Sequence, residues 1–155
     1  MSEADRTVET AEATQPGELL TQVAPLLDAC ELGENDGAWL LCFEDGFVVM
    51  VEMDAYREFL VLTAELGVPP AGCEALVYKQ LLQVAARWQD MQGIRMGLDP
   101  EDDCVLQIAD VPLPNLSVET LKERLESFVA TARYCRQVLA AQEDSSRSSQ
   151  TFVRV

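Results

Sequence analysis

The apolar positions of residues 73–91 fall on two faces of one predicted helix. The segment is rich in Ala, Leu, Gln, Lys and Glu and contains no Gly or Pro, which favours a helix. One stripe contains Val77, Leu81, Val84, Trp88 and Met91, and the other contains Ala75, Tyr78, Leu82 and Ala85. A helix on the surface of a monomer needs only one such stripe. We therefore predict that one stripe packs on the chain's own sheet and the other on a second copy.

Short apolar runs separated by turn residues predict two groups of strands. The predicted strands are residues 39–43, 47–52 and 58–66 before the helix, and residues 94–98 and 104–109 after it. Asp45-Gly46 between the first two runs is a strong hairpin signal. Strands joined by turns this short must be antiparallel, because a parallel pair needs a crossover of about a dozen residues or more.

Two further helices are predicted near the ends of the chain. The first covers residues 17–30, and its apolar face contains Leu19, Leu20, Val23, Leu26, Leu27 and Cys30. Pro25 should kink this helix, or else the helix begins late, near Ala24. The last helix begins after Ser117, a good N-cap, and should run about 20 residues, roughly 30 Å. Its apolar face contains Leu121, Leu125, Phe128, Ala132, Cys135 and Leu139.

The element order helix–three strands–helix–two strands–helix predicts an α+β fold, with a twisted antiparallel sheet packed against helices in a homodimer. Residues 15–142 should form this domain. Residues 1–14 are polar and acidic and should be disordered, and residues 143–155 should form a flexible polar tail.

Charge and composition narrow the range of partners. The 155 residues include 27 acidic and 11 basic ones, for a net charge of −16. Nucleic acids and anionic membranes are bound through clustered Lys and Arg, so neither is an expected partner. No apolar run approaches the roughly 20 residues of a membrane span, and the N-terminus does not resemble a signal peptide. The five scattered cysteines are typical of buried thiols in a reducing cytosol.

Catalytic chemistry finds little support in the sequence. The chain contains no histidine, which removes the commonest general base and metal ligand. The acidic run Asp99–Asp103 lacks the alternate-residue spacing and closing Glu of a calcium loop, so it is interpreted as a solvated turn. Trp39 and Trp88 are interpreted as core or interface residues. We expect no enzyme, no cofactor and no metal site.

Several segments resemble one family of bacterial proteins. The relevant segments are Leu66-Gly67, Leu81-Leu82-Gln83, the block GIRMGLDPEDDCVLQI at residues 93–108, Pro112-Leu113, and LKERLESFVATARYCRQVL in the last helix. Together with the small size and low pI, they resemble the class I effector chaperones of type III secretion systems, which include the Tir chaperone. The resemblance covers about residues 17–140.

The resemblance implies a cytoplasmic bacterial homodimer without catalytic activity. Such a dimer holds the N-terminal segment of a secreted effector in an extended form, which keeps it soluble and ready for secretion. The secretion ATPase is a further expected partner. Two alternatives remain open: an adaptor or regulatory binding protein of the same fold without a link to secretion, and a small enzyme that uses carboxylates.

The strand at residues 47–52 suggests where an effector would bind. Phe47, Val49 and Val51 face one way, whereas Val48 and Met50 face the other, so the strand is apolar on both faces. One face should then serve the core and one a bound chain, unless the first helix covers the second face. The predicted effector-binding residues are Leu20, Val23, Leu27, Leu41, Phe43, Val49 and Val51. The predicted dimer-interface residues are Ala75, Tyr78, Leu82, Ala85, Ile94 and Met96.

Overall fold

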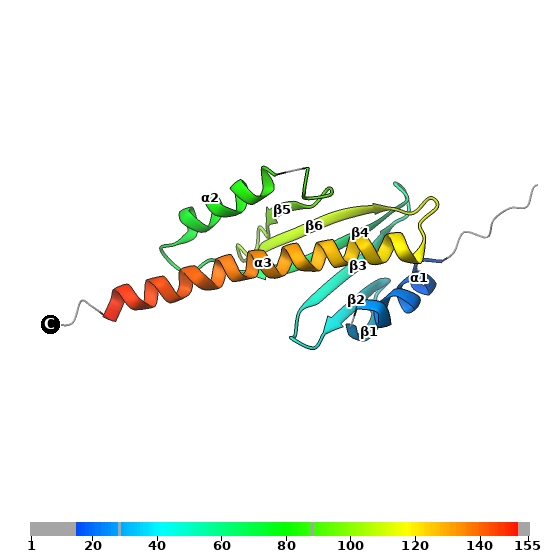
Figure 1. The fold of residues 1–155 in the computed structure, drawn as a ribbon, viewed down its shortest axis with the longest axis horizontal. Helices are drawn as coiled ribbons and strands as arrows, with labels where there is room; N and C mark the ends of the chain where they lie inside the picture. The colour runs from blue at the N-terminus through cyan, green and yellow to red at the C-terminus, as the bar shows by residue number, and fades with distance from the viewer. Residues whose placement is uncertain (1–14, 28, 88, 152–155) are drawn as a thin grey trace, which may run out of the picture.

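The computed structural model describes residues 15–27, 29–87 and 89–151 (Figure 1). Its centre is one six-stranded antiparallel sheet with the strand order β1-β2-β3-β4-β6-β5. The strands are β1 (Ala29–Asn35), β2 (Ala38–Phe43), β3 (Val48–Asp54), β4 (Phe59–Gly67), β5 (Arg95–Leu98) and β6 (Val105–Pro112). The α+β class predicted from the sequence is confirmed, with one strand more than predicted. The predicted disorder of residues 1–14 lies outside the described residues.

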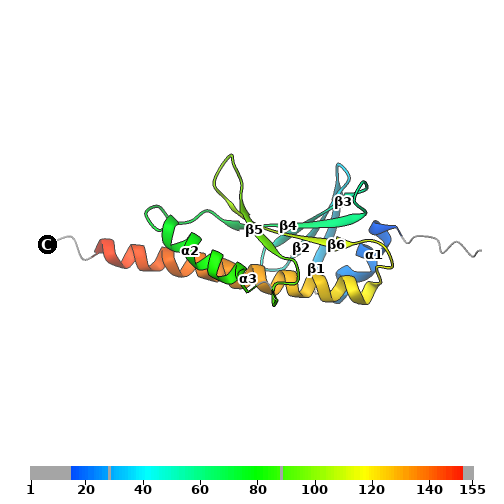
Figure 2. The ribbon, with the colours of Figure 1, turned by 90° about the horizontal axis from the view of Figure 1, so that it is seen from above.

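Three α-helices lie on the same face of the sheet (Figure 2). They are α1 (Pro16–Val23), α2 (Glu74–Ala85) and α3 (Val118–Thr151), and a short 3-10 helix, η1 (Ala24–Leu27), continues α1. α3 runs the length of the sheet and extends past it at its C-terminal end (Figure 1). Ser117 caps α3 as predicted, because its Oγ accepts a hydrogen bond from the N–H of Thr120 at 3.1 Å.

The predicted first helix was wrong in its second half. It was expected to reach Cys30, but α1 ends at Val23, η1 ends at Leu27, and β1 begins at Ala29. β1 pairs with β2 through a hairpin whose two turn residues, Asp36 and Gly37, have φ of 50° and 79°. Positive φ at both positions is the geometry that Asp-Gly favours in a two-residue hairpin turn. The sequence therefore contained a hairpin signal at Asp36-Gly37. The same dipeptide, at Asp45-Gly46, correctly predicted the next hairpin.

The lengths of the two other helices also differ from expectation. α2 has 12 residues and ends at Ala85, well before the predicted Met91. α3 has 34 residues instead of about 20, because its backbone stays helical through most of the segment predicted to be a polar tail. Among the α3 side chains that the structure describes, up to Gln142, the last buried one is Leu139.

The hydrophobic core lies between the helices and the face of the sheet that they cover. It includes Leu41, Val51, Leu62 and Val111 from the sheet and Phe128 from α3. One polar side chain is fully buried in this layer: Gln107 of β6 donates a hydrogen bond from Nε2 to the Phe128 carbonyl oxygen at 2.7 Å. Its Oε1 atom has no hydrogen-bond partner.

Candidate functional site

The opposite face of the sheet is not covered by any of the described helices (Figure 2). Successive side chains of a strand point to opposite faces, so the residues between the buried ones point away from the helices. We call this surface the open face. Its apolar side chains include Leu40, Cys42, Val48, Met50, Val61, Leu106 and Ile108. Val48 is 40% exposed and the other six are half-buried.

The strand register brings these side chains together. Leu40 is opposite Met50, Met50 is opposite Thr63, and Thr63 is opposite Ile108, so a row of side chains crosses four strands. Directly opposite residues on antiparallel strands lie close enough for their side chains to make contact. The result is a continuous apolar surface in the middle of the open face. Monomeric soluble proteins seldom leave such a surface uncovered without a function for it.

Charged groups surround the apolar surface. Glu31, Glu52 and Glu65 are exposed and belong to the open face by register. At one end, Arg95 binds Asp110 through two hydrogen bonds of 3.0 Å. The outer part of the open face is therefore polar, which is the usual arrangement around a protein–protein contact.

A short ion-pair network continues from Asp110 into the β3–β4 turn. The Nη1 atom of Arg57 lies 3.6 Å from Oδ2 of Asp110, and its Nε donates to Oδ2 of Asp54 at 2.6 Å. The backbone N–H of Arg57 and then its guanidinium lower the pKa of Asp54 below its ordinary value. These contacts fix the turn at the end of the open face.

The residues predicted to bind an effector lie on the covered face instead. Leu20, Val23, Leu41, Phe43, Val49 and Val51 are buried in the core, and Leu27 is partly buried against it. α1, η1 and α3 cover the Val49 and Val51 side of the sheet and leave the Val48 and Met50 side open, so the predicted residues are on the covered side. A bound chain reaches only exposed atoms, so these six buried side chains offer it little surface in this structure.

One small hollow does remain beside two of those residues. It has a volume of about 160 Å³ between η1 and α3, and Leu27 and Phe43 line it. The guanidinium of Arg133 lies 5.3 Å from the centre of the Phe43 ring and 3.1 Å from Oδ2 of Asp45. A cation over an aromatic face and an ion pair together hold this arginine at the edge of the hollow.

The predicted dimer residues are mostly accessible. Val77, Leu81 and Val84 point into the core, so the other stripe of α2 faces outward. In that outward stripe Ala75 is exposed, Leu82 is 68% exposed, and Tyr78 and Ala85 are half-buried. Beyond α2, Met96 of β5 is half-buried and Ile94 is buried. Trp88, predicted in the inner stripe, lies outside the described residues.

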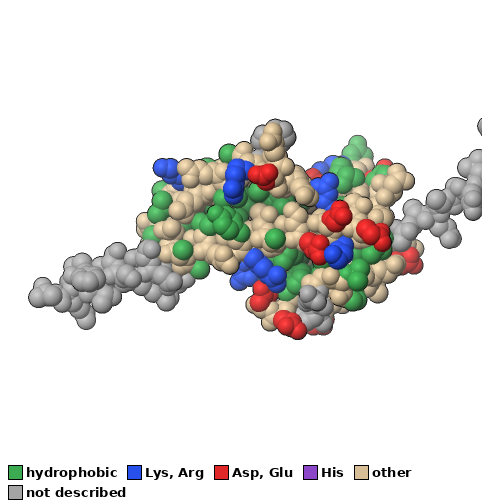
Figure 3. All heavy atoms as spheres, viewed as in Figure 1, with side chains coloured by type: hydrophobic (Ala, Val, Ile, Leu, Met, Phe, Trp, Pro, Cys, Tyr) green, Lys and Arg blue, Asp and Glu red, His purple; other side chains and the backbone are tan. Residues whose placement is uncertain are grey.

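The surface of the helical layer carries both basic and acidic side chains, in different places (Figure 3). Lys and Arg lie over α2 and the middle of α3, around an apolar area between the two helices, and acidic side chains gather where α3 begins (Figure 3). The hollow between α2 and α3 has a volume of about 410 Å³ and is lined by Arg87, Tyr134 and Val138, among others.

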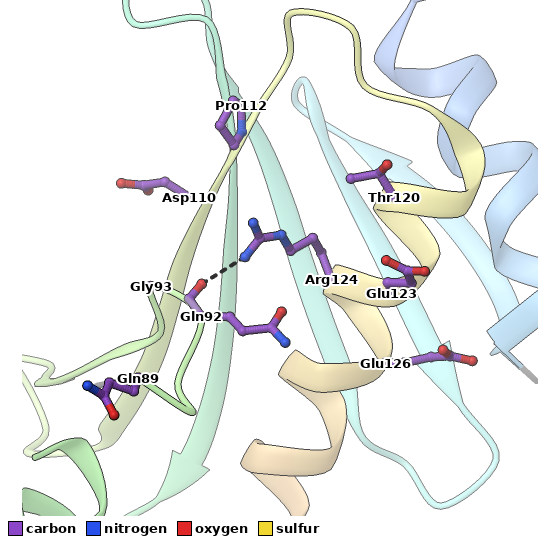
Figure 4. A pocket seen from close by; sticks show the side chains of 9 residues that line it. All are labelled: Gln89, Gln92, Gly93, Asp110, Pro112, Thr120, Glu123, Arg124 and Glu126. Atoms are coloured by element: carbon purple, nitrogen blue, oxygen red, sulfur yellow. Dashed lines mark hydrogen bonds between the residues drawn. The ribbon is translucent and has the colours of Figure 1, made fainter. Parts of the chain in front are cut away.

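A larger cleft, of about 950 Å³, lies between the α2–β5 loop and the first half of α3 (Figure 4). Arg124 crosses it and donates a hydrogen bond from Nη1 to the Gln92 carbonyl oxygen at 3.1 Å. The carboxylates of Asp110, Glu123 and Glu126 also line it. The carboxylate of Asp110 is already bound by Arg95, and the lining residues include no Cys, Ser, Lys or His. The hydrogen bond from Arg124 therefore connects the α2–β5 loop to α3 across the cleft.

Two of the described thiols, those of Cys135 and Cys104, are buried. Burial raises the pKa of Cys135 to about 11 and also raises that of Cys104, so both thiols stay protonated at neutral pH. No group of three or more possible metal ligands occurs among the described residues. None of the helices in the described ranges is long and apolar enough to cross a membrane.

Comparison of the sequence with models of protein families identifies the family of this chain. The model of the Tir chaperone protein (CesT) family matches residues 18–136, well over half of the chain. The chain belongs to this family. Members of the Tir chaperone family are binding proteins and not enzymes. The matched range contains all six described strands, α2, most of α1, and α3 as far as Arg136.

Solved structures show the same fold at low sequence identity. A chain of the HopA1–SchA chaperone–effector complex aligns with a TM-score of 0.60 and 22% identity, covering 78% of this chain and 92% of that chain. A chain of the ExsC–ExsE complex gives a TM-score of 0.64 and 20% identity, covering 83% and 96%. The Yersinia pestis type III secretion chaperone SycH in complex with a fragment of YscM2 gives 0.56 and 23%, covering 76% and 96%. No curated protein matches the chain.

Proposed function

We propose that this member of the Tir chaperone family is a type III secretion chaperone that binds an extended N-terminal segment of an effector on the open face of its sheet. The observation that carries the proposal is the uncovered apolar surface around Met50 and Ile108. All three helices cover the other face, so this surface is available to a partner. Family membership and the chaperone–effector complexes of similar fold support the choice of an effector as that partner.

The free edge at β1 supports an extended form for the bound segment. β1 pairs only with β2 in the described sheet, so its outer N–H and C=O groups are available to another strand. An added strand gains main-chain hydrogen bonds at such an edge, and its alternate side chains give specificity. Side chains of the added strand that point toward the open face would lie beside Glu31 and Gly33 of β1, one strand away from Cys42 and Leu40.

We further propose a homodimer through α2 and β5. The outward stripe of α2 contains the exposed Leu82, and β5 is the second free edge of the described sheet. Leu98 of β5 is 46% exposed. A dimer of ordinary size buries about 800 Å² on each partner, more than one such stripe provides, so β5 should contribute as well.

Family membership is the basis of three other parts of the proposal. The protein acts in the bacterial cytoplasm, the domain formed by residues 15–142 carries the function, and the loaded complex is delivered to the secretion ATPase. An acidic surface suits this role, because a net charge of −16 keeps the complex soluble.

Two valines provide a matched test of the open face. Val48 lies on it and is 40% exposed, whereas Val68 lies in the loop after β4 and is 57% exposed. Each would be changed to Asp, and the N-terminal halves of proteins encoded by neighbouring genes would be co-expressed with each variant. Val48→Asp should prevent co-purification of the effector fragment, since a bound apolar side chain would meet a charge there. Val68→Asp should not.

Folding must be checked separately from binding. Both positions are exposed, so both variants should keep the thermal midpoint of the wild-type protein within a few degrees. Equal binding by Val48→Asp and the wild-type protein would rule out the open face as the binding surface.

A further inference from the structure

A groove lies at the end of the sheet where β2 and β3 meet α1 and the loop between β6 and α3. Its volume is about 1090 Å³. Trp39, Met53, Leu19, Leu113 and Leu116 supply an apolar lining. Met53 is 45% exposed although it points to the covered face of the sheet, because α1 and α3 do not reach over it. This groove is separate from the open face, since Trp39 lies opposite Val51 and shares its side of the sheet.

One wall of the groove is formed by close packing of α1 on an aromatic ring. A Cβ atom added at Gly17 would lie 3.4 Å from Nε1 of Trp39 and 3.6 Å from its Cζ2. The missing side chain therefore lets the first turn of α1 lie directly against the indole. Trp39 is half-buried in this position, so one part of the ring is held by α1 and the rest lines the groove.

The charges at the groove have one sign. Glu34 and Glu58 line it and are exposed, and its lining includes no Lys or Arg. The first fourteen residues of the chain join the structure at Gln15, which also lines the groove. They carry four acidic residues and one basic residue, so like-charge repulsion disfavours them as the occupant. The groove instead suits an apolar group accompanied by positive charge.

The edge strand connects this groove to the open face. Glu34 of β1 lies opposite Trp39, so its side chain points to the groove side of the sheet. Gly33 is opposite Leu40 and belongs to the open face. A strand added beside β1 would therefore send alternate side chains to the two surfaces. A single extended partner reaches both.

We propose that the groove is a specificity site for the bound segment, which places a large apolar side chain against Trp39 with a Lys or Arg beside it that pairs with Glu34 or Glu58. This proposal rests on the proposed function, because the segment is the one that occupies the open face. It predicts a sequence preference: apolar residues for the open face, and at least one basic residue next to an apolar residue for the groove.

A displayed library of random peptides tests this preference. The library would be selected on the wild-type protein, on the charge-reversed variant Glu34→Lys/Glu58→Lys, and on the control Glu44→Lys/Glu101→Lys. The control makes the same charge change at two exposed glutamates in turns at the other end of the strands. Selection on the wild type and on the control should enrich Lys or Arg beside a large apolar residue. Selection on the charge-reversed variant should enrich Asp or Glu there.

Affinity and fluorescence give the quantitative result. A peptide selected on the wild type should bind the charge-reversed variant about tenfold more weakly, since an attractive charge pair becomes repulsive. It should bind the control with unchanged affinity. In a Trp88→Phe background Trp39 is the remaining tryptophan, and its emission should shift when the peptide binds.

The outcomes separate the two proposals. The groove would be ruled out as a specificity site if the selected peptides required Val48 but showed no enrichment of Lys or Arg, or if they bound the charge-reversed variant equally well. Either result would leave the proposed function standing. The groove would also be ruled out if the fluorescence emission of Trp39 did not shift when the peptide bound. Failure to select any peptide, or peptides indifferent to Val48→Asp, would count against the proposed function itself.

Discussion

Replacing Leu82 by Ala should separate the proposed dimer without weakening the monomer. Leu82 is 68% exposed in the outward stripe of α2, so it contributes little to the core of its own chain. If a twofold partner covers it, the substitution removes buried apolar groups from two symmetry-related sites at once.

The size of the effect follows from the exposed fraction of the side chain. Leu→Ala removes three carbon groups, worth about 2.4 kcal/mol at about 0.8 kcal/mol each when fully buried. The 68% that the monomer leaves exposed corresponds to ~1.6 kcal/mol per site. Two sites give ~3 kcal/mol, which is roughly a hundredfold in the dimer dissociation constant.

Sedimentation equilibrium over a range of concentrations measures that constant. Leu26→Ala is the matched control, because Leu26 is 52% exposed on η1, away from α2. It should leave the dimer unchanged. The reasoning would be refuted by a wild-type protein that is monomeric at micromolar concentration, or by a Leu82→Ala protein that dimerises as tightly as the wild type.

Two further predictions concern the core. Gln107→Leu should leave the free energy of unfolding within about 1 kcal/mol of the wild-type value, because removal of the unpartnered Oε1 offsets the loss of the Nε2 hydrogen bond to the Phe128 carbonyl oxygen. A denaturant titration showing a larger loss would contradict this. Cys135 should resist a thiol reagent at neutral pH in the folded protein and react after denaturation. Because its folded pKa is raised from 9.0 to about 11, the stability it contributes is present below pH 9.0 and should be lost as the pH rises to about 11.

Local signals in the sequence were enough to predict most of the sheet. The apolar runs at residues 39–43 and 47–52 and the Asp45-Gly46 turn predicted β2 and β3, and the Ser117 cap predicted the start of α3. β1 was missed because its sequence, ACELGEN, contains no β-branched or aromatic residue. It is a strand because it pairs with β2, a tertiary contact that overrides its weak propensity.

The position of the open face could not be predicted from the sequence in the same way. Val48 and Met50 are as apolar as Val49 and Val51, so the strand pattern alone does not show which side the helices cover. That choice depends on the direction in which η1 leads into β1, a turn that the predicted continuous helix left out. The two stripes of α2 were separated correctly, but no sequence pattern shows whether a second copy covers the outer one.

Amide hydrogen exchange of β1 tests the central claim most directly. The claim is that a partner chain adds to the free edge of β1 and covers the open face. In the free protein, the N–H groups of β1 that point away from β2 should exchange quickly, because the described sheet offers them no partner. On binding of a selected peptide or effector fragment, those amides should become protected, while β5 stays unchanged. Protection confined to α2 and β5, with β1 exchanging as before, would contradict the account.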